Sequence, residues 1–186
     1  MKWKDKLTLL HCIASDLQII HSHGLIHRDL HSALNAVRRE VYGILPYIAP
    51  EALNIGYYST ASDIYSFGII MWEILYGKSV SYNLEFGSQL QIEICRNNLR
   101  PTIIENTPQC YINLMKKCWE RDPINRPSAT KVCEIFAEWL IDESILLELT
   151  KSDELLRNYV ESTHNIQTYS DDIYKNSELK ELNINE

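Results

Sequence analysis

One stretch of this sequence is apolar on every side of a helix. It runs from Ile64 to Tyr76, is interrupted only by Ser66, Gly68 and Glu73, and is closed by Gly77. A soluble helix of this composition must be wrapped by other elements, because it has no polar face to turn toward solvent. The stretch is also too short to span a bilayer. We therefore predict a buried helix at the centre of the domain.

Helical signals surround this stretch, whereas strand signals are almost absent. Thr60 and Asp63 have the spacing of a capping box at its start. Amphipathic helices are predicted over about residues 3–22 and 88–95, from Pro108 to about residue 119, and beyond an N-cap at Ser128. Residues 24–58 show no sustained period and are predicted to be irregular. The sequence thus predicts a predominantly α-helical fold.

Charge divides the chain into two regions. Residues 1–141 contain 14 basic and 14 acidic residues, whereas residues 142–186 contain 4 and 11 and therefore carry the whole net charge of −7. We predict a neutral globular domain over residues 1–141 and an acidic tail over 142–186, weakly helical at first and disordered after about residue 163. Because nucleic acids and acidic membranes require a basic face, neither is an expected partner.

The cysteines indicate a reducing compartment. There are five of them, no pair has C-x-x-C spacing, and the chain contains no Asn-x-Ser/Thr glycosylation sequon. Buried free thiols are the simplest interpretation of an odd number of cysteines without a metal-binding spacing. Residues 1–6 lead into no secretory signal. We expect a soluble, cytoplasmic protein.

Four sequence motifs follow one another in a fixed order. They are His27-Arg28-Asp29-Leu30, Ala49-Pro50-Glu51, the run from Asp63 to Gly68 (DIYSFG), and the run from Cys118 to Ser128 (CWERDPINRPS). The first two match the catalytic loop and the end of the activation segment of protein kinases. Together the four resemble the C-terminal lobe of a eukaryotic protein kinase of the tyrosine-kinase or tyrosine-kinase-like group, over about residues 1–141.

The resemblance implies a catalytic role for the first motif. Kinases transfer the γ-phosphate of ATP to protein hydroxyls, mainly by positioning the reactants and neutralising charge with Mg²⁺. In that family Asp29 would orient the acceptor hydroxyl and take its proton. Arg28 would hold a phosphorylated activation segment, and His27 would be a packing and hydrogen-bonding residue of the loop.

The resemblance implies structural roles for three further residues. Glu51 and Arg126 would form the buried ion pair that ties the activation segment to the helical lobe. Asp63 would accept hydrogen bonds from backbone N–H groups of the catalytic loop. A chain without catalytic activity could keep these structural roles.

Several kinase features are missing or displaced. The family pattern places its magnesium-binding Asn at position 34, which is Leu34 here, and Asn35 stands one residue late. Only 13 residues separate Asn35 from Ala49, and no D-F-G motif lies among them. The sequence also contains no G-x-G-x-x-G loop and no V-A-I-K lysine, so we expect the N-terminal lobe to be absent. ATP and Mg²⁺ are implied by the family, yet we expect the isolated chain to be inactive.

Acceptor specificity stays open between Ser/Thr and Tyr. Ile44 stands where serine/threonine kinases have a Thr that contacts the catalytic Asp, and His31 stands where they have Lys. Together with the pair Cys118-Trp119, these two residues resemble the tyrosine-kinase-like group, whose members mostly phosphorylate Ser and Thr.

Other functions remain alternatives. His23, His27 and His31 recur every four residues and suggest a metal site, but zinc needs three or four converging ligands and Gly24 interrupts the helix. A pseudokinase-type module that binds a protein substrate, a partner kinase or another signalling protein is the alternative function. A non-functional fragment is the third possibility.

Overall fold

The computed structural model describes residues 1–31, 45–80, 87–104 and 106–152 of the chain. These residues contain helices and no strand, which confirms the predominantly helical fold. The elements, in chain order, are α1 (Trp3–Ser22), η3 (Leu45–Tyr47), α2 (Pro50–Ile55), α3 (Thr60–Tyr76), α4 (Gly87–Cys95), α5 (Gln109–Cys118), η4 (Pro123–Asn125) and α6 (Ala129–Ile141). Residues 143–152 are also helical.

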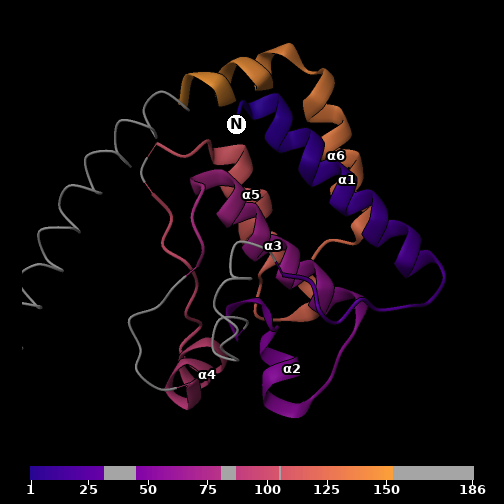
Figure 1. Cartoon of the computed structure of the whole chain (residues 1–186), viewed down its shortest axis with the longest axis vertical. Coiled ribbons are helices and arrows are strands. Elements are labelled where there is room, and N and C mark those ends of the chain that lie inside the picture. The colour runs from indigo at the N-terminus through magenta and orange to yellow at the C-terminus, as the bar shows by residue number, and fades with distance from the viewer. Residues whose placement is uncertain (32–44, 81–86, 105, 153–186) are drawn as a thin grey trace, which may run out of the picture.

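Helix α3 lies at the centre of the fold, as its composition predicts. Figure 1 shows α3 running through the middle, with α1 and α6 side by side along one edge and α2 and α4 at the opposite end. Nearly every residue from Ser62 to Tyr76 is buried. Gly77 ends the helix in the left-handed conformation with φ 67°, which favours glycine.

A glycine in α3 sets how closely α5 approaches. A Cβ atom added to Gly68 would lie 2.9 Å from Cys118 Cβ and 3.3 Å from the backbone nitrogen of Trp119. Such separations are shorter than normal carbon contacts, so any larger residue would push the two helices apart. The helix-propensity cost of a mid-helix glycine is therefore explained by packing.

Aromatic rings connect four helices across the core. Phe67 of α3 meets Phe136 of α6 edge-on at 6.0 Å, and Phe136 meets Trp139 at 5.5 Å. Tyr111 of α5 then lies 6.4 Å from Trp139 and 5.3 Å from Trp3 of α1. Tyr111 and Trp139 are tilted, whereas the other three pairs meet edge to face, and aromatic pairs at these distances stabilise a core beyond the burial of their area.

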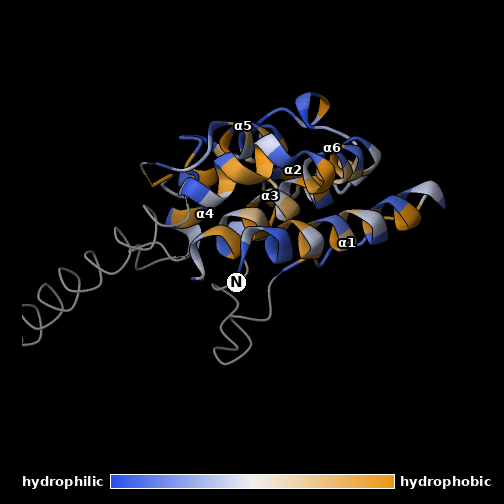
Figure 2. Ribbon diagram, turned by 90° about the horizontal axis from the view of Figure 1, so that it is seen from above, coloured by the Kyte–Doolittle hydropathy of each residue, from blue (hydrophilic) through white to orange (hydrophobic). Residues whose placement is uncertain are grey.

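The long outer helices bury one stripe each. In α1 the buried residues include Leu7, Leu10, Ala14 and Leu17, all on the side facing α3 and α6. Figure 2 shows apolar and polar residues alternating along α1, as expected for a helix half covered by the core. Helix 143–152 follows α6 in the chain, and its Leu149 is fully buried in the same core.

The structure corrects three local predictions. The N-cap of α3 is Ser59 rather than Thr60, and the residue that reaches back to it is Ser62, whose hydroxyl accepts from the Ser59 N–H at 2.7 Å. Pro108 is the N-cap of α5 rather than its first residue. Residues 24–58 are not wholly irregular, because they contain α2, which begins at Pro50. Six residues are too short to show a helical period in sequence.

Candidate functional site

One carboxylate organises the loop that carries the first motif. Asp63, in the first turn of α3, is 1% exposed. Its two oxygens accept hydrogen bonds from the backbone N–H groups of His27 at 2.8 Å and Arg28 at 2.9 Å. His21 Nε2 lies 2.8 Å from the same carboxylate and donates to it, since an ionised carboxylate can only accept. Three donors from α1 and the loop therefore converge on Asp63.

These bonds hold a backbone conformation that the loop would otherwise avoid. Arg28 has φ 68°, a value that non-glycine residues rarely adopt. Strained residues of this kind persist where the surroundings hold them, and they occur at functional sites more often than elsewhere. The Arg28 guanidinium faces the ring of Tyr58, 6.0 Å from its centroid.

The next residue turns its side chain out of the loop. The Asp29 side chain is 78% exposed, and its backbone N–H donates to His27 Nδ1 at 3.3 Å. His31 Nε2 lies 3.9 Å from the Asp29 carboxylate, while its ring meets Tyr47 edge-on at 6.3 Å. Asp29 thus offers a carboxylate to solvent from a fixed backbone.

A pocket opens beside this carboxylate. Its walls come from the loop, from the segment around η3 and from the first half of α3. The lining residues are Arg28, Asp29, Leu30, His31, Tyr47, Ile48, Ala49, Tyr58, Ser62, Asp63 and Ser66. A hydroxyl group entering the pocket would find a hydrogen-bond acceptor in Asp29.

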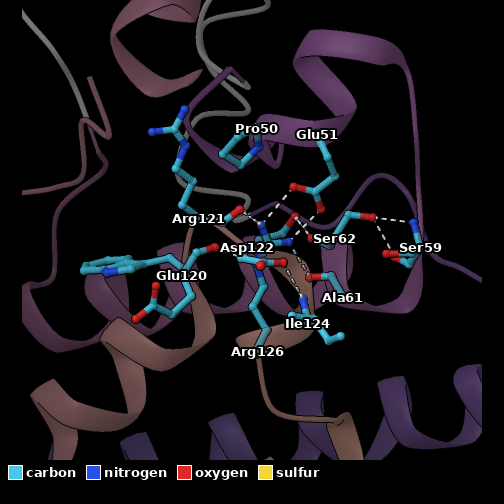
Figure 3. A network of polar contacts seen from close by, with 12 residues as sticks. Pro50, Glu51, Ser59, Ala61, Ser62, Glu120, Arg121, Asp122, Ile124 and Arg126 are labelled. Carbon is cyan, nitrogen blue, oxygen red and sulfur yellow. Dashed lines mark hydrogen bonds and ion pairs between the residues drawn. The ribbon is translucent and has the colours of Figure 1, made fainter. Parts of the chain in front are cut away.

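A second polar network ties α2 to the segment before α6. Arg126 donates to both oxygens of Glu51, at 2.7 and 2.8 Å, and its side chain is fully buried. The same guanidinium donates to the carbonyl oxygens of Ala61, Glu120 and Arg121. Figure 3 shows Arg126 at the centre of these contacts, with Glu51 on one side and the carbonyls around it. All three nitrogens of the guanidinium therefore have acceptors.

A buried acid on α3 was not among the residues predicted from the sequence to have a role. Glu73 is fully buried, and one of its oxygens accepts from the Tyr47 hydroxyl and from the Val80 backbone N–H at 2.9 Å. The Ser66 hydroxyl also donates to the Tyr47 carbonyl at 2.7 Å. These contacts fix Tyr47, which lies two residues before the Ala49-Pro50-Glu51 motif. The sequence signal for Glu73 is that it is the single acid in the largely apolar stretch from Ile64 to Tyr76.

The structure does not bring every candidate residue together. Leu34, Asn35 and Ile44 lie outside the described residues. The histidine repeat does not converge, since the His23 ring contacts the Ile19 carbonyl of its own helix at 2.8 Å. In the part of the chain that is described, no three His, Cys, Asp or Glu side chains gather as a metal site would require.

Comparisons with known proteins decide the family. Residues 36–136 match the sequence profile described as protein tyrosine and serine/threonine kinase. The chain belongs to this kinase family. The matched kinase segment contains Glu51, Asp63 and Arg126, whereas Asp29 lies before it.

Individual relatives include both kinase specificities. The chain is 34% identical to cyclic GMP-binding protein C of Dictyostelium discoideum, over 74% of this chain and 6% of that protein. It is 30% identical to a probable LIM domain-containing serine/threonine-protein kinase of the same organism, over 78% of this chain and 17% of the relative. It is 31% identical to the tyrosine-protein kinase transforming protein Fps of Fujinami sarcoma virus, over 69% and 17%. The kinase chain therefore spans a small part of each relative.

The described helices of this kinase chain include none that is both long and apolar enough to cross a membrane.

Proposed function

We propose that residues 1–141 form the helical, substrate-binding lobe of a protein kinase domain and that residues 142–186 form an acidic extension. The helical fold and the family match support the first part. The charge distribution supports the second. Because Leu149 lies in the core, the first residues of the extension pack against the lobe.

The observation that carries this proposal is the geometry at Asp29. Asp63 fixes the backbone on the N-terminal side of Asp29, while the Asp29 carboxylate stays exposed beside a pocket. A carboxylate held this way accepts a hydrogen bond from a hydroxyl of a protein substrate and takes its proton during phosphoryl transfer. Arg28 and His27 serve the same loop, Arg28 through its exposed cationic side chain and His27 through the bond to the Asp29 N–H.

We further propose that the isolated chain does not transfer phosphate. The family generally uses ATP and Mg²⁺, and their neutralisation of the γ-phosphate charge is a large part of catalysis. The donor set among the described residues does not fit Mg²⁺, since no carboxylate cluster accompanies Asp29. Leu34 replaces the expected Asn ligand, and Asn35 would have to act from the neighbouring position.

Membership of the tyrosine-kinase-like group is also part of the proposal. It is supported by Cys118-Trp119 and by the following Arg121-Asp122-Pro123 and Asn125-Arg126-Pro127 sequences. The acceptor is a protein hydroxyl of Ser, Thr or Tyr. The five free cysteines favour a reducing, cytoplasmic setting, with a protein substrate or a signalling kinase as the partner.

Two measurements test the proposal. Thermal melts of the purified chain with and without Mg·ATP should show the same midpoint, because a ligand raises the midpoint only when it binds the folded form. Phosphate transfer to a mixed peptide substrate should be absent. An upward shift accompanied by transfer that Asp29→Asn abolishes would contradict the proposed inactivity and establish an active kinase.

Peptide binding tests the role of Asp29 directly. Fluorescence anisotropy with Ser-, Thr- and Tyr-containing peptides should detect binding that Asp29→Asn weakens roughly tenfold, as expected for a hydrogen bond to a charged group. Glu138→Gln removes an exposed carboxylate on α6 and should leave binding unchanged. Equal binding by wild type and Asp29→Asn would show that Asp29 does not contact the acceptor.

A further inference from the structure

A thiol, an imidazole and a hydroxyl meet at the contact between α1 and α6. Cys133 Sγ of α6 lies 3.4 Å from His11 Nε2 and 3.2 Å from Ser15 Oγ, both on α1. His11 and Ser15 are one helical turn apart, and the Ser15 hydroxyl also reaches the His11 carbonyl at 2.9 Å. The cluster uses none of the residues of the site described above.

This arrangement suits a thiolate. The nucleophilic form of cysteine is the thiolate, and a neighbouring imidazole is the usual group that takes its proton. Once His11 Nε2 holds that proton, it donates to the sulfur, and the Ser15 hydroxyl can turn to donate as well. Two donors then stabilise the negative charge on Cys133.

Access and partners distinguish Cys133 from the other thiols. Cys118 is fully buried, and its burial raises the pKa of the thiol. Burial also raises the pKa of Cys95 and of Cys110. Cys12 is exposed, but its thiol has no hydrogen-bond partner among the described residues. Cys133 is partly exposed, so a small reagent can reach it, and His11 lies beside it as a base.

We propose that Cys133, with His11 as its base, is a site of oxidation by hydrogen peroxide. The proton of the thiol passes to His11 Nε2, and the sulfur attacks one peroxide oxygen. The O–O bond breaks, the sulfur is oxidised by two electrons to sulfenic acid, and the other oxygen leaves as hydroxide. That hydroxide takes the proton from His11 to form water, which returns the imidazole to its neutral state. The site does not depend on the proposed kinase function.

Site-resolved oxidation of the full chain tests the proposal. The reduced protein is treated with a small excess of hydrogen peroxide, then unfolded in the presence of catalase and dimedone, which traps sulfenic acid. Mass spectrometry then gives the adduct at each cysteine. We expect the adduct at Cys133 to exceed that at Cys12 at least tenfold, since general-base catalysis contributes factors of this size or larger. An adduct at Cys12 equal to or larger than that at Cys133 would overturn the proposal.

Two controls separate the effect of His11 from exposure and from folding. In protein unfolded before the peroxide is added, the ratio of Cys133 to Cys12 adduct should fall to about one, because the helix contact that supplies the base is gone. His11→Gln should lower the Cys133 adduct at least tenfold and leave Cys12 unchanged, with circular dichroism confirming an unchanged fold. An unchanged ratio in either control would show that His11 does not activate Cys133. If His11→Gln does not fold, the wild-type comparison of folded and unfolded protein decides alone.

Discussion

Replacing Arg126 by methionine removes one side of a buried ion pair and leaves several acceptors without donors. The Glu51 carboxylate loses two hydrogen bonds, and the carbonyls of Ala61, Glu120 and Arg121 lose one each. The Glu51 side chain is only 11% exposed, so water can restore little of this bonding. The variant therefore tests whether the network stabilises the fold.

The magnitude follows from the burial of the pair. Removing one partner of a buried ion pair costs about 3–5 kcal/mol, because the other charge stays buried and uncompensated. At roughly 2–4 °C per kcal/mol for a chain of this size, Arg126→Met should lower the melting midpoint by about 6–20 °C. Adding Glu51→Gln to this variant removes the unpaired buried charge. The double variant should therefore regain about 1–3 kcal/mol of stability relative to the sum of the two single changes, which is the coupling energy of the pair.

Urea unfolding of the two single variants and the double variant measures the free energy lost on each change and the coupling energy of the pair. Lys131→Met is the matched control, because its ion pair with Glu134 is more than half exposed on both sides and should be worth less than about 1 kcal/mol. The reasoning is refuted if Arg126→Met costs no more than Lys131→Met. It is also refuted if the effects of Arg126→Met and Glu51→Gln simply add.

Three further changes test other features of the fold. Gly68→Ala should destabilise the protein by up to about 2 kcal/mol in urea, because an overpacking cost of about 1–3 kcal/mol against Cys118 is only partly offset by a helix-propensity gain of about 1 kcal/mol. A more stable variant would contradict this. Burial raises the pKa of Tyr65 to about 12, so the unfolded chain ionises first and stability should fall as pH rises from about 10 to 12. Tyr65→Phe should reduce that alkaline loss, by roughly 1 kcal/mol between the free energies of unfolding in urea at pH 8 and pH 11, and an unchanged loss would count against the burial argument. Hydrogen bonds from Ser144 lower the pKa of Asp142, so the stability that Asp142 contributes is present above about pH 4 and is lost as pH falls through the lowered value. Asp142→Ala should therefore lower the melting midpoint at pH 7 but not at pH 2–3. Equal decreases at the two pH values would show that the charge of Asp142 does not stabilise the fold.

The long helices were predictable because their patterns are long. Helix α1 spans the predicted residues 3–22, and α3 ends at the predicted Gly77. The errors lie at helix starts, where Ser59 and Thr60 are both good caps and only the backbone decides between them. The short helix α2 was missed because six residues contain fewer than two turns.

The site could be predicted only where motifs marked it. Asp29, Asp63 and the pair of Glu51 and Arg126 were named from resemblance, since residues 75 apart in sequence carry no local sign of contact. Nothing in the sequence singled out His21 as a partner of Asp63, because their bond depends on how the last turn of α1 crosses the start of α3. Tertiary crossings of this kind leave no period in the sequence.

The pairing of α1 with α6 determines when the chain can fold during synthesis. The apolar stripe of α1 is made within the first 22 residues, but its partner begins only at Ala129. At roughly 5–20 residues per second, a ribosome leaves that stripe uncovered for about 5–20 seconds. Contacts between such distant segments also slow folding relative to bundles with local contacts. A nascent chain stalled before residue 129 should therefore bind chaperones through α1 and release them once α6 has emerged.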